Sequence, residues 1–394
     1  MKVICTWRPR IAPLAILLLL PGVLTAEPYM AVRYGYTCSQ CHVNPTGGGQ
    51  RNSFGMSFTQ TELPARTIGP GDVDRMRTWL RKPAAAPEGA EPNPSGGTRS
   101  TYVDNHLTDF LSVGTDFRFD LTTTVPRKGA TTSSMDISEG ELYGTFEFLD
   151  ELLTIYLDEQ VAPGGARARE AFGMVRGPLG SYMKAGRIFL PYGIRLLDDG
   201  AFIREQTGFN FGVQDLGVEL GMEPGPVSAS LAISNGTSGT SDDNRDKQIT
   251  GMIQYIRPGW RIGAQGSWNN GNASRRGIVG ANAGLTFGRL AILGEADYMV
   301  DDVYGPAGDI THAVILYGEV DYLLMKGVNL KFTYDYDRPD TAVSRNAFTR
   351  VGGGLEVFPT QFTEVKLLCH WRDEADTSGR MDKVVVTFEF HLFF

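Results

Sequence analysis

From about Leu107 to the end of the chain, hydrophobic and polar residues alternate with a period of two. In SVGTDFRFDL, residues 112–121, every second residue from Val113 to Leu121 is apolar or Thr, and the residues between them are Gly, Asp or Arg. The same alternation recurs in GVNLKFTYDYD, residues 327–337. Successive side chains of a β-strand point to opposite faces. The pattern therefore predicts strands that each have one apolar and one polar face.

Sixteen segments of this kind can be counted, and the connections between them alternate in length. The segments start near residues 107, 136, 152, 169, 180, 212, 226, 246, 259, 277, 289, 311, 327, 347, 361 and 382. Short turns such as LDEL (149–152) alternate with long polar loops such as ISNGTSGTSDDNRDK (233–247). An even strand count with short turns at one end is typical of outer-membrane barrels. Residues 104–394 are therefore predicted to form a sixteen-stranded antiparallel β-barrel, wide enough for an aqueous lumen.

Two further features suit a barrel in outer-membrane lipid. The chain ends in VVVTFEFHLFF, in which alternate residues are apolar and the last is aromatic, and this ending resembles the C-terminal insertion signal of bacterial barrels. Aromatic residues fall near predicted strand ends, where amphipathic rings suit a membrane interface. They are Trp260, Trp268, Tyr298, Tyr322 and Trp371.

The first 26 residues have the pattern of a signal peptide, with basic residues before a short apolar core and a small residue, Ala26, at its end. The alternative is an uncleaved anchor helix, which Pro13 and Pro21 would interrupt. Without this segment 34 Lys and Arg face 45 Asp and Glu, a net charge of −11. Such a charge argues against a nucleic-acid partner, because phosphate binding needs positive charge.

Residues 27–80 form a small N-terminal segment, and residues 81–103 form a linker rich in Pro, Gly and Ala. The small segment contains Cys38-Ser39-Gln40-Cys41-His42. In a C-x-x-C-H motif both thiols attach one haem covalently, and the histidine is the proximal iron ligand. We therefore predict one covalent haem c. Gly47, Gly48 and Gly49 follow, and backbone without side chains can pass close to a flat cofactor.

The Cys38–Cys41 pair has two alternative functions, a zinc site and a redox pair. A structural zinc site needs four ligands, and Cys38, Cys41 and His42 have no second ligand pair nearby. A thioredoxin-like redox pair needs a βαβ setting, which the strand pattern does not provide. For the sixth ligand of the iron, Met56 is nearest in sequence, Met76 and His106 are alternatives, and an open or water-bound iron is a third option.

The longest loop, from about Leu190 to Phe211, is the third long connection. In general porins the third outer loop folds inward and narrows the pore, and the resemblance implies a constriction here. The constriction residues would be Arg195, Asp198, Asp199, Arg204 and Glu205. The alternative is an outward loop with a solvated charge cluster. The strand faces that point inward are rich in Asp and Glu, which would concentrate cations.

The haem motif, the signal-like N-terminus and the strand count together resemble the fused monohaem c-type cytochrome–porins, whose known members include iron-oxidising outer-membrane cytochromes. GRIFLPYGIRL, residues 186–196, is similar to a segment of phosphate-selective-type porins. The resemblance implies an electron conduit in the bacterial outer membrane, with periplasmic electron carriers on one side and an extracellular redox partner or metal ions such as Fe(II) on the other.

The alternative is a diffusion porin for small solutes or ions whose haem-bearing segment is a periplasmic sensor or docking module. No Ser/His/Asp arrangement or carboxylate pair in the sequence supports a catalytic role. A haem segment outside the barrel could not carry charge across an apolar band about 25 Å tall. A conduit therefore requires residues 27–80 to enter or plug the barrel.

Overall fold

The computed structural model describes residues 28–69, 71–72, 75, 102–149, 151–242, 244–272, 274–304, 308–376 and 379–394. The predicted signal peptide, Met76 and nearly all of the predicted linker lie outside these described residues. Three short helices, α1 (Pro28–Tyr34), α2 (Cys38–Cys41) and α3 (Ser53–Thr61), precede the strands. No helix among the described residues has the length and apolar character of a membrane-spanning helix.

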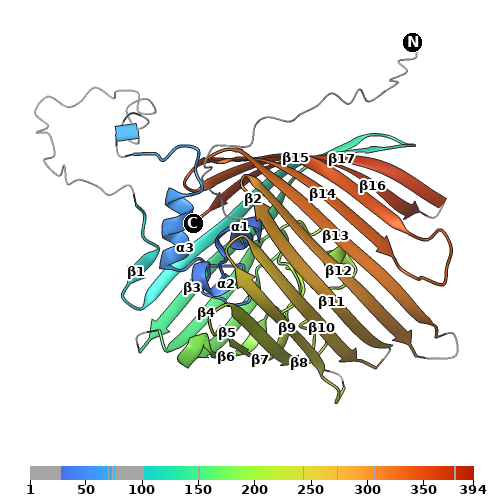
Figure 1. The fold of residues 1–394 in the computed structure, drawn as a ribbon, viewed down its shortest axis with the longest axis horizontal. Coiled ribbons are helices and arrows are strands. Elements are labelled where there is room, and N and C mark those ends of the chain that lie inside the picture. The colour runs from blue at the N-terminus through green and yellow to red at the C-terminus, as the bar shows by residue number, and fades with distance from the viewer. Residues whose placement is uncertain are drawn as a thin grey trace, which may run out of the picture.

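Sixteen strands, β2 to β17, form a closed antiparallel barrel in which each strand pairs with the next and β17 pairs with β2 (Figure 1). A short strand, β1 (His106–Thr108), adds to β2. The barrel strands are β2 (Leu111–Pro126), β3 (Thr132–Phe148), β4 (Leu153–Ala162), β5 (Arg167–Arg176), β6 (Tyr182–Ile188), β7 (Asp215–Met222), β8 (Val227–Ser234), β9 (Gln248–Arg257), β10 (Trp260–Asn270), β11 (Ser274–Phe287), β12 (Leu290–Val303), β13 (Ile310–Met325), β14 (Val328–Arg338), β15 (Phe348–Thr360), β16 (Thr363–Asp376) and β17 (Gly379–Phe393). The predicted fold class is confirmed. Each predicted segment starts within four residues of the first residue of the corresponding strand.

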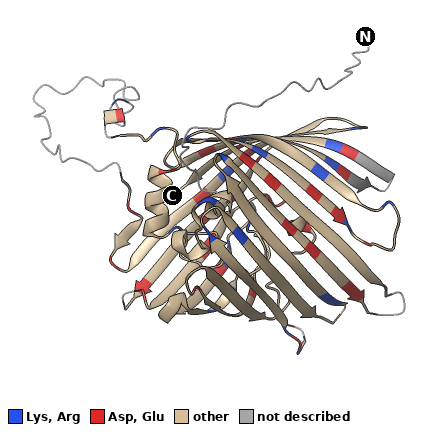
Figure 2. Ribbon diagram, in the orientation of Figure 1, with Lys and Arg blue, Asp and Glu red and all other residues tan. Residues whose placement is uncertain are grey.

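The two faces of the wall differ as the period of two predicts. Apolar side chains such as Leu142, Ile253 and Val279 are more than half exposed on the outer face, which suits contact with lipid. Four of the five aromatic residues predicted near the membrane interface are also exposed, each by less than half: Trp260, Trp268, Tyr298 and Trp371. Charged residues lie along the strands and among the elements inside the barrel (Figure 2). Predicted inner-wall acids with at most 4 % exposure are Glu141, Glu295, Asp297, Glu319, Asp321, Asp335 and Glu364.

Many of these inner-wall acids have a cationic partner in the wall itself. The ammonium of Lys331 lies 3.1 Å from Glu319 and 3.3 Å from Asp321, and Lys366 lies 3.2 Å from Glu364. The predicted acidic lining is therefore largely compensated within the protein, so it attracts cations less strongly than its count of carboxylates indicates.

The N-terminal segment lies inside the barrel, at the end with the short turns. Helix α1 buries Tyr29 and Val32 in an apolar cluster with inward side chains of the wall. The backbone also pairs with the turns: Gly259 N–H donates to Val32 O at 3.0 Å, and Ala65 N–H donates to Phe358 O at 2.8 Å. Figure 1 shows α1 and α2 within the ring of strands and α3 near its edge.

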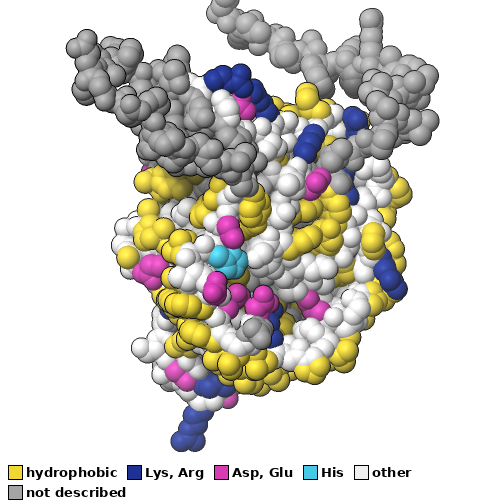
Figure 3. Space-filling view, turned by 90° about the vertical axis from the view of Figure 1, so that its left-hand side faces the viewer, with side chains coloured by type: hydrophobic (Ala, Val, Ile, Leu, Met, Phe, Trp, Pro, Cys, Tyr) yellow, Lys and Arg dark blue, Asp and Glu magenta, His cyan; other side chains and the backbone are white. Residues whose placement is uncertain are grey.

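The long loop between β6 and β7, residues 189–214, also enters the lumen and contains the short helix α5 (Phe202–Glu205). Phe202 N–H donates to Asp335 on β14 at 3.0 Å, and Ile194 N–H donates to Glu295 on β12. The lumen thus holds two inserted segments. From the left-hand side of Figure 1, hydrophobic side chains are widespread over the surface, and Asp and Glu gather near a histidine (Figure 3).

Candidate cofactor site

Helix α2 is a single turn that places the two thiols together. Residues three apart lie on the same side of a helix, so Cys38 and Cys41 face the same way. The turn is closed by His42 N–H, which donates to Cys38 O at 2.9 Å. The hydroxyl of Thr37 donates to Glu223 Oε2 at 2.9 Å, and Ser39 donates to the same oxygen. The motif is therefore fixed to the turn between β7 and β8.

The ring of His42 is oriented by the glycine loop that follows it. Its Nδ1 lies 3.3 Å from the carbonyl oxygen of Gly49. When Nδ1–H donates to this carbonyl, Nε2 keeps its lone pair and can bind a metal. A short antiparallel bridge between His42 and Arg51 holds the loop in this position.

The loop requires glycine at two positions. Gly47 has a φ of +87°, and a Cβ there would lie 3.0 Å from the Cys38 sulfur. Gly49 has a φ of +62°, and a Cβ there would lie 2.0 Å from the hydroxyl of Tyr156 on β4. Left-handed backbone favours glycine at both positions, and at Gly49 a side chain would also clash with Tyr156. The loop can therefore pass both the thiols and the wall.

A cavity of ≈ 220 Å³ adjoins the motif. This is far larger than the few water-sized voids of a packed interior. Its lining comes from three parts of the chain: the N-terminal segment with Cys38, Cys41 and His42, the inward loop with Arg195 and Phe211, and the barrel wall. The wall residues that line it are Asp116, Arg118, Glu139, Glu141, Tyr143, Arg169, Met252, Gln254, Arg261, Leu293 and His391.

These residues fit a haem c. Two thiols on one side of a helical turn, a neutral imidazole beside them and a cavity next to all three are what covalent attachment and axial ligation need. Burial raises the pKa of the Cys41 thiol to about 11. Burial, together with the charge of Arg51, lowers the pKa of His42 to about 4. The imidazole is therefore neutral at pH 7, the form that binds metals.

The predicted distal ligand, Met56, does not line the cavity. It is 1 % exposed within α3, and the α3 residues that line the cavity are Gly55, Phe58 and Thr59. These three positions share one face of the helix, and Met56 lies off that face. Two other methionines, Met30 on α1 and Met252 on β9, do line the cavity.

Of the remaining alternatives for the distal ligand, His106 does not line the cavity. His106 lies on β1, where its Nδ1 is 2.8 Å from Asp104 Oδ1. Met76 lies outside the described residues. Of the described methionines, Met30 and Met252 are the ones that line the cavity beside the cysteine motif.

A buried polar network, absent from the sequence-based prediction, anchors the motif loop to the wall. Lys184 on β6 is 0 % exposed; its ammonium lies 3.1 Å from Glu219 and donates to Asn44 at 2.9 Å and to Thr46. Asn44 in turn donates to Glu170 at 2.7 Å. Asn44 and Lys184 are 140 residues apart in sequence, so no local pattern indicated the contact.

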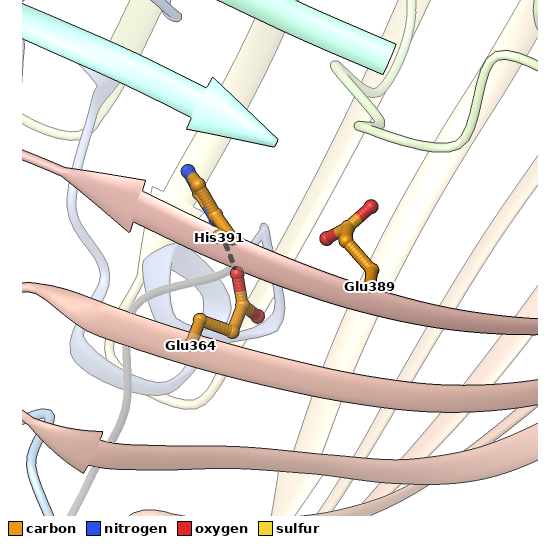
Figure 4. Close-up of side chains that lie close together, drawn as sticks. All are labelled: Glu364, Glu389 and His391. Carbon is orange, nitrogen blue, oxygen red and sulfur yellow. Dashed lines mark hydrogen bonds and ion pairs between the residues drawn. The ribbon is translucent and has the colours of Figure 1, made fainter. Parts of the chain in front are cut away.

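A histidine and two carboxylates form the one group of potential metal ligands found among the described residues. Atoms of Glu364, Glu389 and His391 lie within 4.8 Å of one another, and His391 Nδ1 is 2.6 Å from Glu364 Oε2 (Figure 4). The ammonium of Lys366 already lies 3.2 and 3.4 Å from the two glutamates, and His391 Nε2 is 3.0 Å from Asp116. These contacts compensate the charges of the cluster without a metal ion.

The five predicted constriction residues have different surroundings. Arg195 lines the cavity. Asp198 pairs with Arg350 on β15 at 2.5 Å, and Glu205 pairs with Arg372 on β16 at 2.9 Å. Asp199 is exposed. Arg204 is 0 % exposed and donates to the carbonyls of Tyr192 and Phe209, so it shapes the loop itself.

Comparison with solved structures agrees with the fold. OmpT of Vibrio cholerae is 10 % identical with a TM-score of 0.57, and the match covers 74 % of this chain and 100 % of OmpT. An anion-selective porin from Comamonas acidovorans is 14 % identical with a TM-score of 0.58, covering 72 % and 100 %. The outer-membrane channel DcaP of Acinetobacter baumannii is 10 % identical with a TM-score of 0.55, covering 72 % and 97 %.

No protein-family model matches the sequence, and no curated protein matches it. At these identities the similarity to solved structures concerns the fold alone. The chain is a porin-like barrel of sixteen strands.

Proposed function

We propose that the protein is an electron conduit of the bacterial outer membrane, in which one haem c is held inside the barrel. The observation that carries the proposal is the position of Cys38, Cys41 and His42 within the lumen, beside a cavity that the wall helps to line. Electrons would pass between periplasmic carriers at the end with the short turns and an extracellular partner or metal ion at the other end.

The position of the motif shortens the distance that electrons would have to cross. The apolar band of an outer-membrane barrel is about 25 Å tall, and a cofactor outside it would leave that whole height to cross. A motif inside the ring of strands shortens the gap on both sides. The N-terminal segment and the inward loop also occupy part of the lumen, which favours a redox role over solute flow.

The chain's own residues have separable tasks. Cys38 and Cys41 would hold the haem through thioethers, and His42 would hold its iron, with Gly49 O fixing the ring. When bound, the haem supplies a one-electron couple. The network around Lys184 keeps the motif loop at a fixed place on the wall. The inward loop closes the cavity from the far side through Arg195 and Phe211.

A second function, a diffusion porin, is favoured by the solved structures of similar fold, one of which is described as an anion-selective porin. In that case the N-terminal segment would be a sensor or docking module, and solutes would pass beside it. The two functions differ in what should cross the protein: electrons in one, hydrated solutes in the other.

The test uses the intact protein in proteoliposomes of known orientation. Visible spectra should show covalent haem that is reduced and reoxidised by membrane-impermeant agents added to either face. The double variant Cys38→Ser/Cys41→Ser is the matched control, and it should carry no haem. Redox response from the face with the short turns alone would contradict the conduit. High single-channel conductance of the intact protein would favour the diffusion porin instead.

A further inference from the structure

The cavity is lined by five arginines, and they divide into two groups. Arg118 and Arg169 are paired: Arg118 lies 3.2 Å from Asp116 and 2.5 Å from Glu139, and Arg169 contacts Glu139 and Glu141. The others form no ion pair with any described residue; they are Arg51, Arg195 and Arg261. The lining therefore contains three guanidinium groups without an ion-pair contact among the described residues.

Arg195 has only neutral partners. Its guanidinium lies 4.9 Å from the ring centre of Phe189 and 5.6 Å from that of Phe211, and it donates to Leu190 O at 3.1 Å. The nearby carboxylates are engaged elsewhere. Glu170 accepts from Asn44 and from the Phe189 N–H, whereas Glu219 is held by the ammonium of Lys184 and the hydroxyl of Tyr182.

Arg261, on β10, is similarly unmatched. Among the described residues its side chain donates one hydrogen bond, to the amide oxygen of Gln254 at 3.1 Å, and its Nε is buried without a partner. Arg51 differs, because its guanidinium lies 4.6 Å from the ring centre of Phe393 and is stabilised by the negative charge of Asp116. Arg195 and Arg261 both line the cavity, the first from the inward loop and the second from the wall. Two guanidinium groups without an ion pair therefore border one cavity.

A charge withdrawn from water without a counter-ion is costly, and both guanidinium groups are half-buried. Burial and the neighbouring Arg204 lower the pKa of Arg195 to about 10, so the group is still charged at pH 7. Two half-buried cations that border one cavity without an ion pair indicate that the ligand of the cavity brings the anions. Guanidinium groups match carboxylates in a two-pronged geometry.

We infer that Arg195 and Arg261 are the residues that bind the two propionate carboxylates of the haem. The inference rests on the proposed function, because it takes haem as the ligand. It gives the inward loop a task beyond narrowing the lumen: Arg195 comes from the loop and Arg261 from the wall, so the cofactor would tie the two together. In a diffusion porin the same pair would bind permeating anions.

The test measures the midpoint potential of the haem by spectroelectrochemical titration, across the pH range in which carboxyl groups titrate. The variants are Arg195→Gln, Arg261→Gln and the double variant. Each should lower the potential, most in the double variant, because loss of a positive charge favours the more positive ferric state. The pH at which the midpoint potential changes should also rise, since a propionate without its guanidinium has a higher pKa.

Arg187→Gln is the matched control. Arg187 is a half-buried arginine that donates to the backbone oxygen of Gly239 at 3.4 Å and does not line the cavity. Its potential should equal that of the wild type. Where a Gln variant does not insert, Arg195→Lys and Arg261→Lys serve instead: the charge stays but the two-pronged contact is lost, which should shift the propionate bending band in resonance Raman spectra.

The outcomes separate the two proposals. A double variant with covalent haem, an unchanged potential and an unchanged pH dependence overturns the propionate pair and leaves the conduit standing. An unshifted propionate band in the Lys variants does the same. A wild-type protein without covalent haem, whose anion selectivity depends on Arg195 and Arg261, overturns both and supports the porin.

Discussion

The N-terminal segment and the inward loop both fill the lumen, but they are held there by different contacts. The segment is joined to the wall by a buried lysine network, by backbone pairing with the short turns and by glycines that allow close approach. The loop is joined through buried apolar side chains such as Phe202, through backbone N–H groups that donate to wall carboxylates, and through ion pairs such as Asp198 with Arg350 and Glu205 with Arg372, the second of them partly exposed. Because the ion pair in its lysine network is fully buried, we expect the segment to be the more rigid of the two.

The largest effect is expected at the buried anchor of the segment. Lys184→Met removes a cation that is 0 % exposed and leaves Glu219, also 0 % exposed, without its cationic partner. We expect the free energy of unfolding to fall by about 3 kcal/mol, because the surviving charge stays buried. Urea titration in detergent micelles would measure it. Lys247→Met, which removes an exposed pair with Asp242, is the control and should cost less than about 1 kcal/mol.

A pair of glycines, one in each region, sharpens the comparison further. Gly49→Ala in the segment combines a φ of +62° with a Cβ placed 2.0 Å from Tyr156 Oη. Gly208→Ala in the loop has a φ of +81° but no atom within 4 Å of the new Cβ. Backbone strain alone costs about 1–2 kcal/mol, and the first variant adds a clash.

Gly49→Ala should therefore lower the free energy of unfolding by about 2 kcal/mol or more, and Gly208→Ala by about 1 kcal/mol. The same titration measures both. Equal losses of unfolding free energy in the two variants would mean that the segment accommodates the clash with Tyr156 without further cost. The contrast in rigidity would then be wrong.

The smallest effect is expected at the outer contact of the loop. Glu205→Gln removes an ion pair with Arg372 in which the glutamate is 41 % exposed. Exposed pairs contribute about 0.2–1 kcal/mol and are screened by salt, so the loss should stay within that range and shrink as salt is added. A loss as large as that of Lys184→Met would show that this loop is held as firmly as the segment.

The strands could be predicted because their signal is local. An alternation such as that from Val113 to Leu121 reflects a wall with lipid on one side and a polar interior on the other, and it needs no knowledge of the partner strand. The cysteine motif is local in the same sense. Its position inside the barrel is not, because that position depends on contacts such as Asn44 with Lys184, between residues 140 apart.

The lining of the cavity beyond the motif could not be predicted for a related reason. Proximity in sequence favoured Met56, but α3 begins at Ser53 and so turns Gly55, Phe58 and Thr59 toward the cavity. Met252 and Arg261 reach the cavity from the wall, more than 200 residues after the motif. Only the closure of the barrel brings them there.

The enclosure of α2 also bears on the order in which the protein is made. Cys38 and Cys41 lie within a closed ring of hydrogen-bonded strands, with the inward loop on one side and the rest of the segment on the other. Both thiols are half-buried there, which leaves a second protein little room to reach them. If the cysteines carry a haem as we propose, its attachment would therefore precede closure of the ring, and it would be seen as modified cysteines on chains that have not yet folded. The barrel would then assemble around a cofactor already in place.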